Sequence, residues 1–292
     1  MAWPASTSYR YTALIVAVGA ALAWAGSHHG QLAFGWPLFA LCGAIAFAIN
    51  WLAFVPANVY QTEHYYDLTG SCTYLSLVAT TWLLGAPPDA RTWLIGGLVV
   101  VWAGRLGSFL FRRVKQDGSD GRFDDIKPDA PRFFMTWTLQ ALWVYLTLAC
   151  GLAAMTAGQR VPLDAFAAVG AVLWLAGFAI EVTADRQKRA FRADPANDGR
   201  FITTGLWAWS RHPNYFGEIL LWLGVAVIAL PVLQGFQYVT LISPVFVYLL
   251  LTRVSGIPML ESRAKKKWGT EDAYRAYKAR TPVLVPRPPR GS

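Results

Sequence analysis

Charged residues are scarce in this sequence, which excludes an ordinary water-soluble domain. Only 15% of its 292 residues are charged, compared with about 25% in a typical soluble domain. Hydrophobic residues make up 55% of the chain and fall into long blocks, so a water-soluble core of this length could not hide them all. The composition therefore predicts a membrane protein.

Several motifs of soluble enzymes are also missing. There is no G-x-G-x-x-G or P-loop segment, so a bound nucleotide would not be held by a Rossmann turn. No cluster of His, Cys and Asp has the spacing of a metal site, and there is no G-x-S-x-G nucleophile elbow. Cys42, Cys72 and Cys150 lie in or beside apolar stretches and match no metal or redox pattern, so we interpret them as small hydrophobic residues.

Eight apolar blocks dominate the chain, and each predicts a helix. A bilayer-spanning helix needs roughly 20 apolar residues, and the third block is short enough to be a helix buried among the others. We therefore expect an all-α fold: a polytopic membrane helix bundle of seven or eight transmembrane helices, forming one domain over residues 1–292 with a flexible tail at 286–292. The blocks are residues 11–30, 37–60, 73–86, 92–114, 133–157, 161–183, 215–233 and 237–256.

The distribution of Lys and Arg predicts the orientation in the membrane. The net charge is +9, and basic residues gather at 112–132, 186–211 and 263–280. A helical hairpin separates each basic segment from the next and returns the chain to the side of the membrane that it left. All three basic segments therefore lie on one side, which is the cytoplasmic side according to the positive-inside rule. The opposite turns, at 157–161 and 233–237, carry almost no charge. The excess charge follows from this rule alone or marks an anionic ligand; nucleic acid is not expected, because the basic residues occupy short loops.

Ionisable residues inside membrane helices are costly, by roughly 2.5–3.5 kcal/mol or more each, so each needs a reason. In the segment QTEHYYD at 61–67, Glu63 and Tyr66 are about one helical turn apart. A protonated carboxyl and a phenol there would polarise a substrate carbonyl; the alternative is a solvated loop. Arg105 lies within an apolar run and keeps its charge at any ordinary pH, so it needs a carboxylate or a bound anion unless its side chain extends to the cytoplasmic end.

Glu181 and Asp185 lie four residues apart at the end of the sixth apolar block and share one helix face. Their carboxylates would accept hydrogen bonds from ribose hydroxyls or an amide. Pairing with Arg186 or Arg189 is an equally good interpretation.

The segment SRHPNYFGE at 210–218 leads into the seventh block. Asn214 and Glu218 are one turn apart and share a face, and Gly217 allows another backbone or a flat ring to approach closely. A buried carboxylate beside His212 and Asn214 suits a ligand with an amide or a ring. The alternative is a helix start with a stabilising acid near its positive end.

Together, these features suggest a lipophilic molecule that is modified by a soluble, anionic cofactor. Many cationic groups on one face suit a ligand with several phosphates, because Arg binds phosphate in a bidentate manner. A tunnel between apolar helices suits an apolar co-substrate. A dinucleotide that delivers hydride fits this description, and so does S-adenosylmethionine, which is less anionic.

The segment RFITTGLWAWSRHPNYFGE at 200–218 resembles the C-terminal signature of steroid 5-alpha-reductases, their bacterial relatives and the sterol C14/C7 reductases. Residues 181–192 and 276–286 resemble the same group, and the N-terminal half does so less clearly. The resemblance implies that NADPH reduces the C4–C5 double bond of a 3-oxo-delta-4 steroid or a similar lipophilic enone. Hydride passes to the beta carbon while a carboxyl/tyrosine pair polarises the ketone oxygen.

The resemblance also implies site residues. Glu63 and Tyr66 are the candidates for the catalytic pair, although Thr62 separates Gln61 from Glu63 where the family has a Gln-Glu pair, and the family's tyrosine falls alternatively at Trp102. No metal is expected. The implied cofactor-binding residues are Arg105, Arg113, Asp120, Arg122, Asp185, Arg192, Arg200, His212, Asn214 and Glu218.

Two other functions remain open. Isoprenylcysteine-carboxyl-methyltransferase-like enzymes share an Arg-His-Pro-x-Tyr-x-Gly-type segment, so an S-adenosylmethionine-dependent membrane methyltransferase is the alternative. A lipid-binding or scaffold protein that has kept the fold without the chemistry is the third. In each case we expect a monomer in a lipid bilayer. We expect the reductase in the bacterial inner membrane, with its cofactor site facing the cytoplasm.

Overall fold

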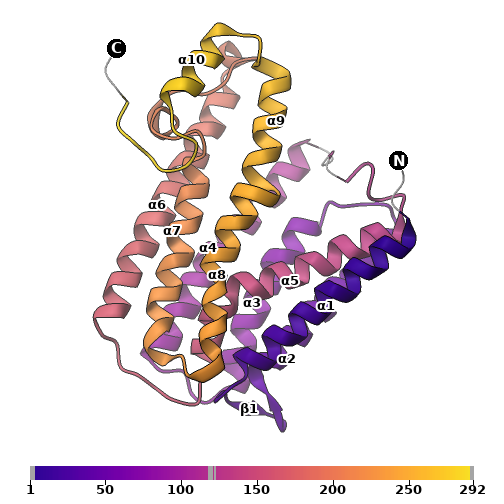
Figure 1. The fold of residues 1–292 in the computed structure, drawn as a ribbon, viewed down its shortest axis with the longest axis vertical. Helices are drawn as coiled ribbons and strands as arrows, with labels where there is room; N and C mark the ends of the chain where they lie inside the picture. The colour runs from indigo at the N-terminus through magenta and orange to yellow at the C-terminus, as the bar shows by residue number, and fades with distance from the viewer. Residues whose placement is uncertain (1–3, 118–120, 122, 290–292) are drawn as a thin grey trace. The chain divides into compact units, whose positions relative to one another are not determined.

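The computed structural model describes residues 4–117, 121 and 123–289 of a mainly helical chain (Figure 1). All eight predicted apolar blocks form helices, which supports the predicted all-α class. The one sheet among these residues is an antiparallel pair of two-residue strands, β1 (Leu32–Ala33) and β2 (Trp36–Pro37). The α-helices are α1 (Ala5–Gly26), α2 (Leu38–Val59), α3 (Tyr66–Leu84), α4 (Ala90–Asp117), α5 (Ala130–Met155), α6 (Ala165–Ala193), α7 (Pro213–Ala229), α8 (Ile242–Leu249), α9 (Gly256–Trp268) and α10 (Asp272–Arg280).

Among the described residues, six helical segments are long and apolar enough to cross a membrane, which indicates an integral membrane protein. The predicted count of seven or eight spans is not confirmed, and α3, which is rich in Ser and Thr, is not among the six. The six segments are α1, α2, α5, α6, α7 with the turn after it (Pro213–Val232), and the continuous helical stretch Gly235–Trp268.

The chain divides into two compact units. The first comprises residues 1–167 and 228–243, and the second comprises residues 168–227 and 244–292. The single domain expected from the sequence stays a prediction, because two compact units can belong to one domain.

α5 is the central helix of the first unit. It packs against α1, α2 and α3, and 89% of its most apolar stretch is buried. Asp129 caps its N-terminus, where the carboxylate accepts a hydrogen bond from the Arg132 amide. Trp137 and Tyr145 are fully buried, and the Tyr145 hydroxyl donates to the carbonyl of Phe39 in α2 at 3.0 Å.

The two turns that the sequence places opposite the basic segments lie together at one end of the first unit. The Gly158 amide donates to the His29 carbonyl at 2.9 Å, and the Gln234 side chain donates to that of Gln159 at 2.7 Å. Turns 157–161 and 233–237 are therefore on one face of the unit, as the predicted topology requires.

Arg91, at the start of α4, ties this end together. Its guanidinium is 2% exposed and forms an ion pair with Asp164 at 3.0 Å. It also donates to the carbonyls of Val161 at 3.2 Å, Pro162 at 2.7 Å and Ile228 at 2.5 Å. All of these acceptors are internal, so the role of Arg91 is structural.

In the second unit, α6 and α7 approach so closely that their backbones are in contact. A Cβ atom on Gly177 would lie 2.5 Å from the Gly217 carbonyl oxygen, and one on Gly224 would lie 2.5 Å from that of Gly170. The glycines are seven residues apart on each helix, about two turns, so the close approach repeats along the contact. The prediction that Gly217 admits another backbone is confirmed, and that backbone is α6.

The chain after α10 packs along the segment that precedes α7. The Arg211 amide donates to the Pro282 carbonyl and the Arg287 amide to the Trp209 carbonyl, both at 2.9 Å. The Ser210 hydroxyl donates to the Leu284 carbonyl at 2.8 Å. These bonds connect the C-terminal segment to the residues that lead into α7.

Candidate functional site

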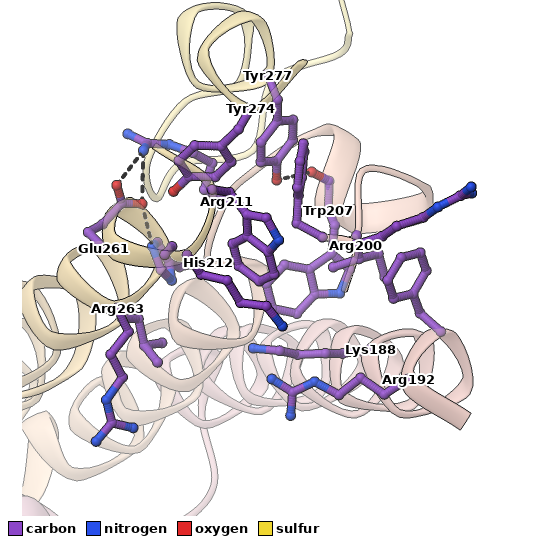
Figure 2. A pocket seen from close by; sticks show the side chains of 17 residues that line it. Lys188, Arg192, Arg200, Trp207, Arg211, His212, Glu261, Arg263, Tyr274 and Tyr277 are labelled. Carbon is purple, nitrogen blue, oxygen red and sulfur yellow. Dashed lines mark hydrogen bonds and ion pairs between the residues drawn. The ribbon is translucent and has the colours of Figure 1, made fainter. Parts of the chain in front are cut away.

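The second unit contains a pocket of about 280 Å³ at the end of α6 (Figure 2). α6 forms one side, the segment before α7 forms another, and α9 and α10 complete it. The lining residues are Lys188, Phe191, Arg192, Arg200, Phe201, Ile202, Trp207, Arg211, His212, Leu260, Glu261, Arg263, Ala264, Lys267, Trp268, Tyr274 and Tyr277.

Aromatic rings make up much of the pocket wall. The Phe201 ring centre lies 5.1 Å from that of Tyr274 and 5.6 Å from that of Trp268. The Tyr277 hydroxyl donates to the Trp207 carbonyl at 2.7 Å, which fixes α10 to the segment before α7. Flat rings held in this way offer stacking surfaces to a planar ligand.

Six Lys or Arg side chains line the pocket, compared with one carboxylate. The Lys188 ammonium lies 4.7 Å from the Trp207 ring centre, and that of Lys267 lies 4.9 Å from the Trp268 ring centre, within cation–π range. In Figure 2, Arg200 lies at the opposite end of the pocket from Glu261. Three of the guanidinium groups form no ion pair with any described residue: those of Arg192, Arg200 and Arg263.

The one lining carboxylate, Glu261 on α9, is already engaged. It accepts from Arg211 Nη1 at 2.7 and 2.8 Å, lies 3.2 Å from His212 Nε2 and pairs with Lys278 at 2.9 Å. The buried Arg211 Nε has no hydrogen-bond partner among the described residues. Because the lining has six Lys or Arg side chains and its one carboxylate is paired, the pocket's own chemistry fits an anion.

Burial controls the protonation of the pocket's titratable rings. It lowers the pKa of His212 below its ordinary value of 6.5, although the hydrogen bond and charge of Glu261 oppose the shift. The imidazole is therefore neutral at pH 7, and the carboxylate beside Nε2 makes that nitrogen the donor. Burial also raises the pKa of Tyr274 and Tyr277, so both phenols remain hydrogen-bond donors.

The pocket brings together Arg192, Arg200 and His212, three of the residues that the resemblance implied for the cofactor. The other implied residues of this unit do not line it: Asp185 lies on α6, and Asn214 and Glu218 lie on the first turns of α7.

In the first unit, the predicted catalytic pair belongs to one turn. The Tyr66 amide donates to the Glu63 carbonyl at 2.9 Å. Glu63 is 3% exposed, which excludes a solvated position for this residue, and its carboxylate lies 2.5 Å from the Lys127 ammonium. The Tyr66 hydroxyl donates to the Thr136 carbonyl at 3.1 Å. The catalytic role of the pair stays a prediction.

The remaining implied cofactor residues belong to the first unit. Arg105 is half-buried in the middle of α4. Asp120 and Arg122 lie outside the described residues, and so does the side chain of Arg113. Their roles stay predictions.

The sequence analysis did not identify most of the residues that line the pocket. Arg211, Glu261 and the two tyrosines of α10 come from separate elements, and about 50 residues or more separate Arg211 from the others. One signal was available: Tyr274 and Tyr277 are three residues apart in a strongly basic helix, which places two rings on one face.

The fold and the pocket together indicate an integral membrane protein with a cationic, aromatic pocket. A family model described as "Protein of unknown function (DUF1295)" matches residues 53–281, most of the chain, and the chain belongs to this family. The family includes steroid 5-alpha-reductase-like proteins.

Two curated proteins are similar to parts of the chain. An uncharacterized protein of Schizosaccharomyces pombe is 27% identical over 46% of each chain. A protein of Ustilaginoidea virens named as a probable O-methyltransferase is 27% identical over 29% of this chain and 30% of its own length. The chain thus matches less than half the length of each relative. No solved structure matches it.

Proposed function

We propose that this protein is an integral membrane enzyme that uses NADPH to reduce the carbon–carbon double bond of a lipophilic enone, such as a 3-oxo-delta-4 steroid. The pocket of the second unit binds the phosphate-bearing part of the cofactor. NADPH supplies the hydride when it is bound, and the protein supplies placement and charge. In the proposed orientation, the pocket faces the cytoplasm from a bacterial inner membrane.

The charge of the pocket carries this proposal. Six Lys or Arg side chains line it, and its only carboxylate is already paired. NADPH is a polyanion, and its phosphates suit guanidinium forks. S-adenosylmethionine has no phosphate and carries a cationic sulfonium and ammonium, which six neighbouring cations would repel.

The pocket's aromatic wall adds a second reason. A purine ring gains from stacking on indole or phenol faces and from nearby guanidinium groups, and the lining offers both. Arg192, Arg200 and Arg263, which form no ion pair with any described residue, are the lining side chains best suited to bind phosphate oxygens.

Of the predicted pair Glu63 and Tyr66, the proposal makes Tyr66 the donor to the ketone oxygen. The buried Glu63 carboxyl group is already paired with the Lys127 ammonium, so the phenol of Tyr66 is the better hydrogen-bond donor of the two. To polarise a ketone oxygen, its hydroxyl must leave the Thr136 carbonyl and donate to the substrate, where charge develops.

The alternative is an S-adenosylmethionine-dependent methyltransferase. It is favoured by the name of the Ustilaginoidea virens relative and by the Arg-His-Pro-Asn-Tyr segment at 211–215. The two candidates differ in the charge of the ligand, so binding discriminates between them directly.

The test is calorimetry on the purified full chain with NADPH, NADH and S-adenosylmethionine, followed by NADPH consumption with a 3-oxo-delta-4 steroid. We expect NADPH to bind most tightly and to be oxidised. Lys267→Ala should weaken NADPH binding about tenfold, the effect of one charge-assisted hydrogen bond. Lys266→Ala is the matched control, because Lys266 precedes it on α9 but does not line the pocket. Binding of S-adenosylmethionine without NADPH would overturn the proposal.

A further inference from the structure

The connection between α1 and α2 presents a cluster of exposed apolar side chains, here called the aromatic cap. The β1–β2 hairpin, closed by Phe34 and Gly35, forms its tip. Behind it, the Phe236 ring lies 4.9 Å from that of Trp24 in α1. The cap consists of Trp24 (67% exposed), Leu32 (65%), Phe34 (82%), Trp36 (71%), Phe236 (50%) and Tyr238 (50%).

Neither the local backbone conformation nor internal packing explains why a phenylalanine occupies position 34. Its φ is +53°, and that of Gly35 is +80°. Tight hairpin turns that need positive φ at both positions favour Asn-Gly, and a non-glycine residue there costs about 1–2 kcal/mol. Because the Phe34 side chain is 82% exposed, its contacts with the described residues are too few to offset that cost.

The base of the hairpin is held firmly, so the exposure of its tip is not the result of fraying. The Gln31 amide donates to the Thr156 carbonyl at 2.7 Å, and its side chain donates to the Ala157 carbonyl at 2.8 Å. The same side chain accepts from the Ala86 amide at 2.6 Å. One glutamine thus connects the hairpin to the ends of α5 and α3.

The position of the cap points to its partner. α1 and α2 are both candidate membrane spans, so their connection lies where the chain leaves the hydrocarbon. No Asp, Glu, Lys or Arg occurs between Trp24 and Leu38. A two-stranded ribbon has unpaired backbone groups that need water, whereas exposed aromatic rings favour the headgroup level of a bilayer.

We propose that the aromatic cap is an interfacial anchor that places Phe34 and Trp36 between the headgroups and acyl chains of a phospholipid leaflet. The leaflet is the one at the C-terminal end of α5, because Gln31 is bonded there, whereas the basic residues Lys127 and Arg132 lie at the opposite end of that helix. The anchor is independent of the proposed reductase function.

The test uses the full chain in phospholipid nanodiscs, which expose both faces to solvent. Cys72 is exposed, whereas Cys42 and Cys150 are buried, so a Cys72→Ala background with Phe34→Cys accepts one fluorescent NBD label. Nitroxide lipids at the headgroup or upper acyl chain should quench this label at least about twofold more than a label at Asp124→Cys. Asp124, whose side chain is 66% exposed, precedes α5 and serves as the water-exposed control.

Three results would overturn the proposal. The first is quenching by aqueous iodide equal to that of the control. The second is strongest quenching by a nitroxide deep in the acyl chain, which would place the tip inside the hydrocarbon. The third is quenching that disappears when labelled protein is diluted with unlabelled protein, which would make a second copy the partner.

A second variant keeps the test independent of substitution at Phe34 itself. A label at Leu32→Cys should be quenched by the same shallow nitroxides, and adding Phe34→Asn should reduce that quenching about twofold. Asn suits the positive φ of the turn, so the hairpin is kept while its anchor is lost. Unchanged quenching in the Asn variant would show that Phe34 does not anchor the tip.

Discussion

Arg91 and Arg200 have the same type of side chain but differ in burial and in ion pairing. Arg91, in the first unit, is 2% exposed, pairs with Asp164 and donates to three carbonyls. Arg200, in the second unit, is exposed at the rim of a pocket and forms no ion pair with any described residue. The fold explains the first guanidinium completely and leaves the second available to a ligand.

The difference shows that internal hydrogen-bond acceptors, rather than charge itself, distinguish a structural arginine from one that is available to a ligand. A buried guanidinium must be neutralised within the protein, and Arg91 meets that demand with backbone oxygens. Arg200 does not need an internal partner, because its side chain is exposed to water. Each prediction below changes one side of this comparison.

The largest expected effect is on the structural side. Arg91→Met keeps an apolar stem but removes the donor to three carbonyls and the ion pair with Asp164, so we expect a loss of about 3–5 kcal/mol of unfolding free energy. Thermal unfolding in detergent measures it. Arg160→Met is the control, because Arg160 is 29% exposed and lies 3.5 Å from Asp89, and should cost about 1 kcal/mol or less. Equal losses in the two variants would contradict the structural role.

A smaller effect concerns the α6–α7 contact, which supports the pocket. Gly177→Ala would put a Cβ 2.5 Å from the Gly217 carbonyl and should cost about 1–3 kcal/mol of unfolding free energy. Gly97→Ala is the matched control, because a Cβ atom on Gly97 would meet no neighbouring group within 4 Å, and should stabilise α4 by about 0.5–1 kcal/mol. If both variants changed the unfolding free energy in the same direction, the contact between the α6 and α7 backbones would be contradicted.

The binding side of the comparison predicts a change in affinity without a change in stability. Arg200→Ala should raise the Kd for NADPH about tenfold and alter unfolding by no more than about 0.5 kcal/mol. Arg275→Ala, at a 60% exposed side chain paired with Asp272, should change neither. A large stability loss in Arg200→Ala would place Arg200 in the same class as Arg91.

The smallest effect is a pH dependence from His212. Its pKa in the folded protein is below the ordinary 6.5 because the ring is buried, so the unfolded chain binds this proton more readily. The resulting stability is fully present above pH 6.5 and is lost as the pH falls through the lowered value. Unfolding midpoints of wild type and His212→Asn, measured from pH 7.5 downward, should converge in acid. Parallel curves would contradict a lowered pKa.

Much of the fold was predictable from the sequence, because continuous apolar blocks of helical length are a strong signal for membrane helices. The same holds for the part of the site that one segment encodes: Arg200 and His212 were grouped by the stretch 200–218. Glu261 was not predictable, because its partners Arg211 and Lys278 lie 50 and 17 residues away. Arg91 was missed for a different reason: its acceptors are mostly backbone carbonyls, which every residue has and no motif records.

The glycine contact between α6 and α7 fixes the distance between the two sides of the pocket. Lys188 and Arg192 extend one helix, and Arg211 and His212 precede the other, so the separation of these groups is set where two main chains touch. Side chains adjust to a ligand by changing rotamer, but main chains in contact cannot move closer. Under the proposed function, selection among anions of different length would therefore begin at the Gly177–Gly217 contact, about three helical turns from Lys188.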